Sequence, residues 1–351
     1  MNHFTKRQLL GHASALAGLA LLEMKGLRPA RAGDSSSSDL WSRDAVGLKV
    51  SQGRWETSET LFSEVHFESI FLRQPGSVRL HLLLFLPISA KRGEKVPAAL
   101  ESDPYRREPV RSDPAQVDSY FGRDFQYLPQ HSYAAVYLGT RGSGTSEGIP
   151  SDEYAVDEME DTKRVIEWIS KQHWSNGNVG MYGLSYSAFN SVWMAAALKP
   201  PALKALFVRG GTDNRYTDDV HFPGGTMVMV NNAWALGMLT DNATPGGPDY
   251  DVDSQASLDR WNTPPWLQIF LHNQHDGPHW QRGSLWPDYG RLTTPTFLAG
   301  GYLDKYQNFV PRIMKHSPAT TMGILGPWHH AMTWPGPVLD WEALMVRWFD
   351  H

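Results

Sequence analysis

Short apolar runs alternate with helical patterns along much of the chain. Runs typical of buried strands cover residues 78–86, 96–100, 133–138, 178–182, 203–208, 295–299 and 320–325. Residues 157–171 place apolar side chains at helical spacing, with acidic residues early and a lysine late, which suits the helix dipole. A second helix is expected from Tyr186 until Pro200-Pro201 stops it. This alternation predicts an α/β fold with a mostly parallel sheet that is covered on both faces.

Two stretches depart from this rhythm. An alternating stretch begins at Val65, and the Gly76 turn predicts that it pairs antiparallel with residues 78–86. Residues 212–288 are rich in Asn, Asp, Gly, Pro and Trp, and they predict an insertion that forms a cap over a pocket. The domain is therefore expected in two parts, residues 33–211 and residues 289–351.

Residues 1–32 carry the pattern of an export signal. Lys6-Arg7 precedes a short apolar stretch, and Ala30-Arg31-Ala32 is a small-x-small cleavage pattern. The cation pair is similar to a twin-arginine signal with Lys6 in place of the first arginine, so the Sec route stays open. We expect a periplasmic or secreted protein. An amphipathic first helix of the domain is the alternative, because polar residues interrupt the apolar stretch.

Composition narrows the chemistry. The chain has 351 residues, 32 basic and 37 acidic side chains, 41% hydrophobic residues and no cysteine. Thiol nucleophiles, thiolate metal sites and disulfides are therefore excluded. The net charge of −5 gives no reason to expect a nucleic-acid partner. An uninterrupted run of about 20 apolar residues, which a stable membrane span needs, is missing. No cofactor is expected.

The sharpest chemical signal is Gly183-Leu184-Ser185-Tyr186-Ser187, which lies between a predicted strand and a predicted helix. A tight strand-to-helix turn presents a serine hydroxyl openly, and the helix start places backbone N–H groups where negative charge develops during acyl transfer. The usual pentapeptide has Gly where this chain has Ser187. The alternative is an ordinary strand-to-helix loop that contains a serine.

A nucleophilic serine needs a base and an acid, in the chain order serine, acid, histidine. Asp304 and the pair His329-His330 each follow a predicted strand, at the sheet edge where ligands bind. We expect His330 to take the Ser185 proton and Asp304 to orient the imidazole, with His329 as a competing base. The alternatives are a turn carboxylate and loop histidines.

Taken together, these motifs resemble the CocE/NonD acyl hydrolases, a group with cocaine esterase and α-amino-acid ester hydrolases that is related to Xaa-Pro dipeptidyl peptidases. The resemblance rests on residues 103–106, 141–148, 174–183, 185–186, 219–225, 326–328 and 347–351. It implies an α/β-hydrolase fold and an acyl-enzyme mechanism on small ester, amide or short peptide substrates. It implies Ser185 as nucleophile, Asp304 as acid and His330 rather than His329 as base. The Tyr105 hydroxyl and the Tyr186 backbone N–H would form the oxyanion hole.

The chain departs from the family at several points. Ala188 replaces a usual glycine, and Gly139 replaces a usual aspartate. Members of the family continue into a jelly-roll domain, whereas this sequence stops at His351. We therefore expect an exposed surface that a homo-oligomer or a partner covers. An inactive truncated scaffold that binds a partner is the alternative to an enzyme.

Other candidates are weaker. The loop over residues 142–148 lacks the ending of a phosphate cradle. His272, His275, Asp276 and His279 have metal-ligand spacing, but Gly277-Pro278 interrupts a helix there, so no metal is expected. Asp218 and Asp219 could bind a substrate ammonium, and a solvated loop is the favoured alternative for them. Xaa-Pro dipeptidyl peptidase activity is the alternative reaction.

Overall fold

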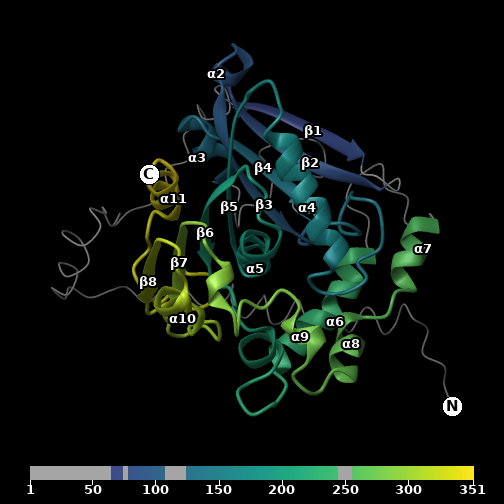
Figure 1. Cartoon of the computed structure of the whole chain (residues 1–351). Helices are drawn as coiled ribbons and strands as arrows, with labels where there is room; N and C mark the ends of the chain where they lie inside the picture. Colours follow the sequence, from purple (N-terminus) through teal and green to yellow (C-terminus); the bar gives the residue numbers. More distant parts are fainter. Residues whose placement is uncertain (1–64, 74–77, 107–123, 244–254) are drawn as a thin grey trace.

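A computed structural model describes residues 65–73, 78–106, 124–243 and 255–351 of the chain. Its centre is an eight-stranded sheet in the order β1-β2-β4-β3-β5-β6-β7-β8 (Figure 1). The strands are β1 (Val65–Arg73), β2 (Arg79–Pro87), β3 (Val96–Asp103), β4 (Ala134–Gly139), β5 (Ser175–Leu184), β6 (Leu203–Arg209), β7 (Thr296–Gly301) and β8 (Thr321–Gly326). The predicted export signal lies outside the described residues.

The sheet is parallel from β4 onward and antiparallel at one edge. β1 pairs antiparallel with β2, from Val65 opposite Pro87 to Arg73 opposite Arg79, and β2 pairs antiparallel with β4. The remaining pairings, from β4 with β3 to β7 with β8, are parallel. Parallel strands end at a common edge, so this order carries the loops after β5, β6, β7 and β8 to one side of the fold. The mixed α/β architecture predicted from the hydrophobic pattern is confirmed.

Side-chain alternation along the strands feeds two cores. In β2, Leu84 faces the core that holds α4 (Val156–Ile169), whereas the next residue, Phe85, faces the core that holds α3 (Asp124–Gln130). Helices α5 (Tyr186–Trp193) and α10 (Phe309–His316) pack on the α4 side, and α11 (Trp341–Phe349) packs on the α3 side. The short helix α2 (Ile88–Lys91) follows β2. Both faces of the sheet are thus covered, which explains the nearly continuous apolar runs in its strands.

The helix that follows Ser185 changes from α-helical to π-helical geometry before it ends. α5 passes into a π-helical turn, η4 (Met194–Leu198), and Lys199 then adopts the left-handed conformation. Pro200 follows directly, and proline cannot continue the helix because it lacks the N–H donor. The predicted stop at Pro200-Pro201 is therefore where the helix ends.

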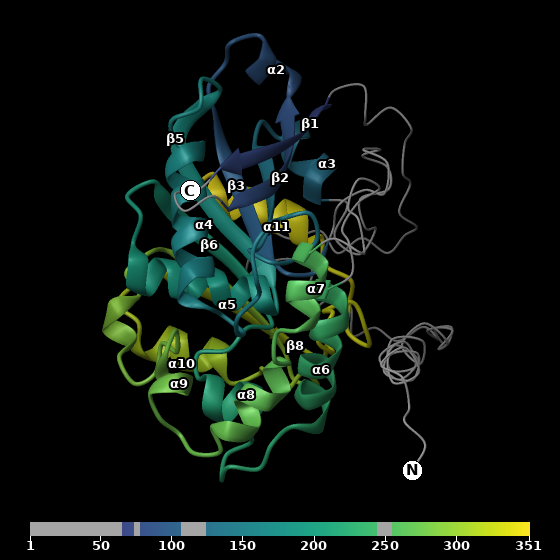
Figure 2. The same cartoon turned by 90° about the vertical axis from the view of Figure 1, so that its right-hand side faces the viewer.

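A helical insertion separates β6 from β7. It contains η5 (Tyr216–Val220), α6 (Met229–Ala243), α7 (Gln255–Trp261), α8 (Trp266–His272), α9 (Pro278–Gln281) and η6 (Tyr289–Arg291). Helix α6 contacts both α7 and α8, and Figure 2 shows the three helices grouped at one side of the fold. The insertion is joined to the sheet where Leu285 N and Trp286 N donate to Asp213 O, just past the end of β6.

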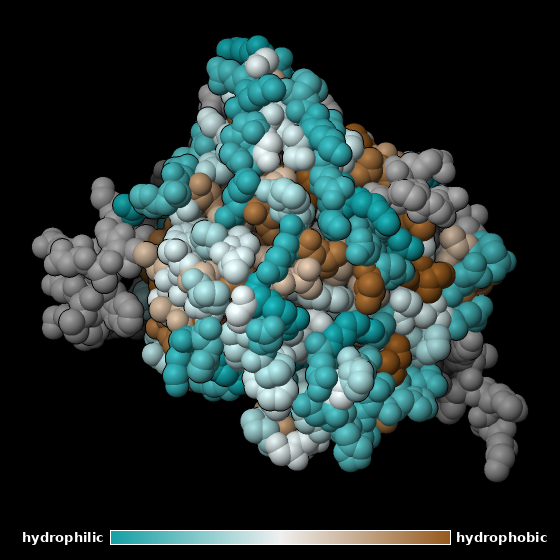
Figure 3. Space-filling view, viewed as in Figure 1, coloured by the Kyte–Doolittle hydropathy of each residue, from teal (hydrophilic) through white to brown (hydrophobic). Residues whose placement is uncertain are grey.

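The surface is mixed in character. On the face shown in Figure 3, apolar side chains lie among hydrophilic ones toward the middle and one side of the molecule. Among the residues that the structure describes, the most exposed large apolar side chains are Met229 and Val230, at the start of α6. Within the described part of the chain, none of the helices combines the length and the apolar character required to cross a bilayer.

Candidate active site

Ser185 lies at a strained turn between β5 and α5. Its backbone has φ 66° and ψ −117°, a region that residues with a side chain seldom occupy. Ser185 N donates to Arg209 O at 3.0 Å, which fixes the turn against the end of β6. Tyr186 is the first residue of α5, so its backbone N–H has no acceptor within the helix. This is the geometry that presents a serine hydroxyl beside a helix N-terminus.

The side chain of Ser187, where the usual pentapeptide has glycine, is buried and points back toward the end of β5. Its Oγ lies 3.1 Å from Leu184 N, from which it accepts, and 3.1 Å from Oε1 of the buried Glu101, to which it donates. Ala188 packs against the next loop, since a Cβ at Gly211 would lie 3.0 Å from the Ala188 Cβ. Ser187, which departs from the usual pentapeptide, and Ala188, which departs from the family pattern, are both accommodated because glycines, Gly183 and Gly211, stand opposite them.

Asp304 and His330 form a hydrogen-bonded pair. Asp304 follows β7 and His330 follows β8, and Asp304 Oδ2 lies 2.8 Å from His330 Nδ1. The Asp304 side chain is buried, whereas the His330 side chain is 38% exposed. His329, which the sequence offered as a competing base, is exposed and stacks on Trp334 instead, with ring centroids 5.2 Å apart. The structure therefore pairs the acid with His330.

Gly210 lies between the turn that carries Ser185 and the Asp304–His330 pair. A Cβ on Gly210 would lie 3.1 Å from Asp304 Oδ2, 3.1 Å from Leu184 Cδ1 and 3.3 Å from His330 Nδ1. Leu184 directly precedes Ser185, and Gly210 directly follows the residue whose carbonyl accepts from Ser185 N. The loops that carry Ser185, Asp304 and His330 therefore converge around Gly210, although up to 145 positions separate them in the sequence (330 − 185).

Tyr105 and Tyr186 lie next to each other at the same edge. Their ring centroids are 6.2 Å apart in an edge-to-face arrangement. Tyr105 is partly exposed, and its backbone N donates to Asp103 Oδ1 at 2.9 Å. The Tyr186 ring is buried, so only the backbone of this residue is placed to serve an oxyanion.

The buried Tyr186 hydroxyl belongs to a network that the sequence did not reveal. It donates to Glu158 Oε2 at 2.9 Å and accepts from Tyr154 N at 2.9 Å. Asn190 Nδ2 donates to Glu158 Oε1 at 2.8 Å. Burial raises the pKa of Glu158 to about 7. From sequence alone, Glu158 is one more acid in the first turn of α4, and nothing in its spacing indicates that it supports α5.

The expectation of a solvated loop for Asp218 and Asp219 is wrong, because both side chains are buried on η5. Asp218 binds Arg312 at 2.8 Å and accepts from Asn308 at 2.7 Å. Asp219 Oδ1 accepts from the Tyr306 hydroxyl at 2.6 Å, whereas Asp219 Oδ2 has no hydrogen-bond partner. The chain buries these carboxylates because cations, amides and a hydroxyl from the loop after β7, from α10 and from α6 meet them. A role of either in substrate binding stays a prediction.

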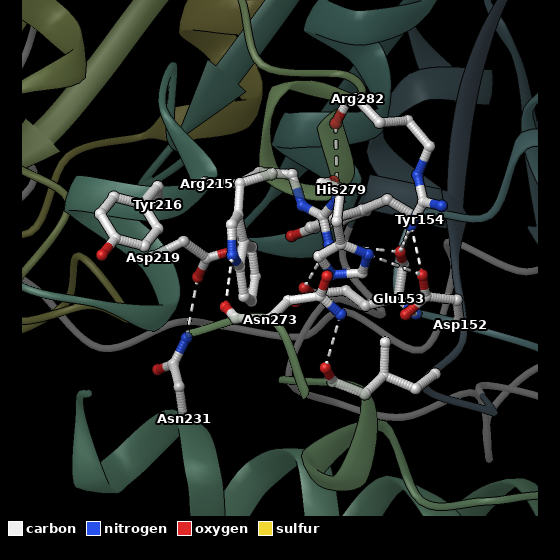
Figure 4. A network of polar contacts seen from close by, with 12 residues as sticks. Asp152, Glu153, Tyr154, Arg215, Tyr216, Asp219, Asn231, Asn273, His279 and Arg282 are labelled. Carbon is white, nitrogen blue, oxygen red and sulfur yellow. Dashed lines mark hydrogen bonds and ion pairs between the residues drawn. The ribbon is translucent and has the colours of Figure 1, made fainter. Parts of the chain in front are cut away.

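A second buried network joins residues of the insertion to the loop before α4 (Figure 4). Arg215 and Glu153 are both fully buried, and Arg215 Nη2 lies 2.9 Å from Glu153 Oε2. Desolvation raises the pKa of Glu153 to about 8, with the nearby charge of Asp219 as the next contribution. Arg282 pairs with Asp152 at the outer side of the network. These ion pairs tie the insertion to the loop before α4.

The candidate metal ligands do not come together. His272 ends α8, Pro278 begins α9, and the turn between the two helices separates His272 from His279. His279 lies beside Asp152 in the network of Figure 4, and desolvation lowers its pKa to about 4. Across the residues that the structure describes, no group of three or more His, Asp or Glu side chains is arranged to hold a metal ion.

Comparison with known proteins places this chain in a family. Residues 76–332 match the model of the X-Pro dipeptidyl-peptidase (S15) family. The chain is 28% identical over 298 residues to cocaine esterase from Rhodococcus sp. (strain MB1 Bresler), an alignment that covers 75% of this chain and 48% of that protein. The chain thus spans about half the length of this curated relative.

Solved structures show the same fold at lower identity. A CocE/NonD family hydrolase from Staphylococcus aureus superposes with a TM-score of 0.61 at 20% identity, over 81% of this chain and 48% of that one. An aminopeptidase from a marine sediment Thaumarchaeota archaeon superposes with a TM-score of 0.62 at 19% identity, over 86% and 57% of the two chains. Because the family model covers most of its length, this chain belongs to the X-Pro dipeptidyl-peptidase (S15) family.

Proposed function

We propose that this chain is a serine hydrolase that cleaves ester or amide bonds of small substrates through an acyl-enzyme on Ser185. The observation that carries the proposal is the Asp304–His330 pair at 2.8 Å, next to the strained turn that presents Ser185. Such a pair supplies an oriented base, and the turn supplies an exposed hydroxyl. The match to the S15 family and to cocaine esterase supports the same reaction class.

The proposed reaction has two halves. In the first, Ser185 Oγ attacks the substrate carbonyl carbon while His330 Nε2 takes the hydroxyl proton, and Asp304 stabilises the imidazolium. The carbonyl oxygen becomes an oxyanion that the Tyr105 hydroxyl and the Tyr186 N–H stabilise. The tetrahedral intermediate then expels the leaving group, which receives the proton from His330. In the second half a water molecule repeats these steps on the acyl-enzyme and releases the acid.

Covalent labelling tests the nucleophile. A fluorophosphonate reagent phosphonylates an activated serine and expels fluoride, so the purified chain is expected to gain one adduct and lose its hydrolysis of aryl esters. Ser185→Ala should neither label nor turn over. Ser170→Ala, which removes a serine hydroxyl at the end of α4, is the matched control and should behave as wild type. Full ester turnover by Ser185→Ala would overturn the proposal, and absence of labelling and turnover in wild type would favour the scaffold alternative.

Release of Xaa-Pro dipeptides is the second candidate reaction, and the description of the matched family favours it. It needs a site for a free amine, for which the buried and partnerless Asp219 Oδ2 is the candidate acceptor. Hydrolysis of Gly-Pro anilide but not of acetyl-Gly-Pro anilide would support it. Equal rates on both anilides, or hydrolysis of simple esters alone, would exclude it.

We further propose that the protein is exported, because Lys6-Arg7 and Ala30-Arg31-Ala32 have the arrangement of a cleaved signal. Cell fractionation tests this. The mature protein is expected outside the cytoplasm with an N-terminus just after Ala32, and Arg7→Gln should slow its export. Full-length protein that stays in the cytoplasm would contradict it.

A further inference from the structure

We infer that Tyr306 is a positioning residue for His330 and that Asp219, from the insertion, holds Tyr306 in place. The inference rests on the proposed function, since it concerns the base of that reaction. The Tyr306 and His330 ring centroids lie 5.2 Å apart with the rings tilted by 44°. Tyr306 is buried, so its ring is a fixed surface beside the partly exposed imidazole.

The hydrogen bond from Asp304 alone does not fix the orientation of the His330 imidazole. The Asp304–His330 hydrogen bond fixes one ring atom, Nδ1, but the imidazole can still turn about that bond. A ring packed beside the imidazole restricts this turning and keeps Nε2 directed toward one place. Tyr306 also reaches the acid, because its backbone N lies 3.4 Å from Asp304 Oδ1, the oxygen that His330 does not use. One residue therefore contacts both members of the pair.

Asp219 anchors the Tyr306 ring at its far end. The Tyr306 hydroxyl donates to Asp219 Oδ1 at 2.6 Å. Burial and the neighbouring carboxylates hold the pKa of the Tyr306 hydroxyl well above its usual range, so the hydroxyl stays protonated and remains a donor. Lys305 Nζ lies 4.2 Å from the centre of the Tyr306 ring and hydrogen-bonds to Asp219 O at 3.1 Å. The ring is thus held at its hydroxyl and on one face.

The anchor itself is built into the insertion. Asp219 lies on η5, and Asn231 Nδ2 of α6 donates to Asp219 Oδ1 at 2.8 Å. Lys305 also contacts Asn231 Oδ1, so the loop after β7 is tied to both η5 and α6. A cap residue therefore contacts the acid–base pair through one tyrosine. This assigns the insertion a part in catalysis that differs from covering a pocket.

The two oxygens of Asp219 separate this role from the binding of a substrate amine. The hydrogen bonds of its side chain fall on Oδ1, whereas Oδ2 has none. Asp219→Asn can keep the acceptor at Oδ1 and place its NH₂ group at Oδ2, so the hold on Tyr306 survives while the charge is lost. Asp219→Ala removes both. If Asp219 positions Tyr306, the Asp219→Asn variant should keep this function. If Asp219 binds a substrate ammonium, the same variant should lose it.

The kinetic test uses an aryl ester that carries no amine. Tyr306→Phe and Asp219→Ala are each expected to lower kcat roughly tenfold with KM changed less than about twofold, because misplacing a catalytic group slows the step without weakening binding. Asp219→Asn should stay within about threefold of wild type. Tyr133→Phe is the matched control, since it removes a similar hydrogen bond, from the buried Tyr133 to Asp350 at 2.8 Å, and should leave kcat unchanged.

A second readout does not depend on turnover. In Ser185→Ala protein at fixed pH, NMR follows the ring-proton resonances of His330, whose assignment comes from His330→Gln. Tyr306→Leu should move these resonances toward those of a freely turning imidazole, because it removes the aromatic ring, centred 5.2 Å away, that restricts the turning.

The outcomes separate the two proposals. An unlabelled and inactive wild type would refute the proposed function, while a change of the His330 ring-proton resonances in Tyr306→Leu would still support the contact with Tyr306. Unchanged His330 resonances in Tyr306→Leu, together with wild-type kcat in Tyr306→Phe, would overturn the positioning role. An Asp219→Asn protein as slow as Asp219→Ala on the ester without an amine would also overturn it.

Discussion

Gly183 and Ser187 approach so closely that a Cβ on Gly183 would lie 2.3 Å from Ser187 Cβ and 2.1 Å from Ser187 Oγ. Real side chains do not tolerate such distances, and Ser187 cannot move away because its hydroxyl is bonded to Leu184 and Glu101. Gly183→Ala should therefore destabilise the turn by about 1–3 kcal/mol or more and lower activity with it. Thermal unfolding measures the change. Gly277→Ala, where the nearest atom to a new Cβ lies 4.0 Å away, is the control, and equal melting temperatures for the two variants would contradict this packing.

The Tyr105 hydroxyl is expected to stabilise the oxyanion. Tyr105→Phe keeps the ring that packs edge-to-face on Tyr186 and removes only the donor. Losing one oxyanion donor costs about 10²–10³ in kcat, and KM should change little because the charge develops only in the transition state. Steady-state kinetics on an aryl ester measures both constants. A kcat within threefold of wild type would remove Tyr105 from the oxyanion hole.

Glu158 is expected to make stability fall as the pH rises. Burial raises the pKa of the Glu158 carboxyl from 4.5 to about 7 in the folded protein, so the folded state holds this proton more tightly than the unfolded state does. The resulting stabilisation is complete below about pH 4.5 and is lost as the pH rises through 7, up to roughly 3 kcal/mol at about 1.4 kcal/mol for each pH unit.

Glu158→Gln tests this because it cannot titrate. Urea unfolding between pH 4.5 and 8 should show a flatter dependence of the unfolding free energy in this variant than in wild type. Other buried acids, among them Glu153, titrate in both proteins, so the difference between the two curves isolates Glu158. Parallel curves would show that Glu158 does not change its protonation in this range.

The buried Arg215–Glu153 pair predicts a large stability effect from a residue outside the proposed triad. Above about pH 8, where Glu153 is ionised, Arg215→Met leaves a buried carboxylate without its cation, and breaking such a pair typically costs about 3–5 kcal/mol. Arg79→Met is the control, since its pair with Glu147 is exposed and should contribute little. Chemical denaturation of the two variants compares them. Similarly small losses of unfolding free energy in both variants would show that the buried pair contributes no more to stability than the exposed pair.

The sequence predicted the sheet and the loops that carry the candidate site better than it predicted the buried residues that pack around that site. Ser185, Asp304 and His330 each follow an apolar strand and lie in recognisable motifs, so their meeting at one sheet edge could be expected. Glu158, Glu153 and Tyr306 carry no such signal. Their partners lie far away in the sequence, as Asp219 does from Tyr306, and only tertiary packing shows which carboxylates are buried. For the same reason Asp218 and Asp219 were expected in solvent.

The proposed mechanism requires Ser185 to carry the acyl group of the substrate. Rapid acid quenching during hydrolysis of a slowly deacylated aryl ester, followed by peptide mass mapping, measures this directly. We predict a burst of about one equivalent of phenol and one acyl group on the peptide that contains Ser185, with the burst slowed at least about a thousandfold in His330→Gln. Turnover without a burst, or an acyl group found on a different residue, would contradict the account.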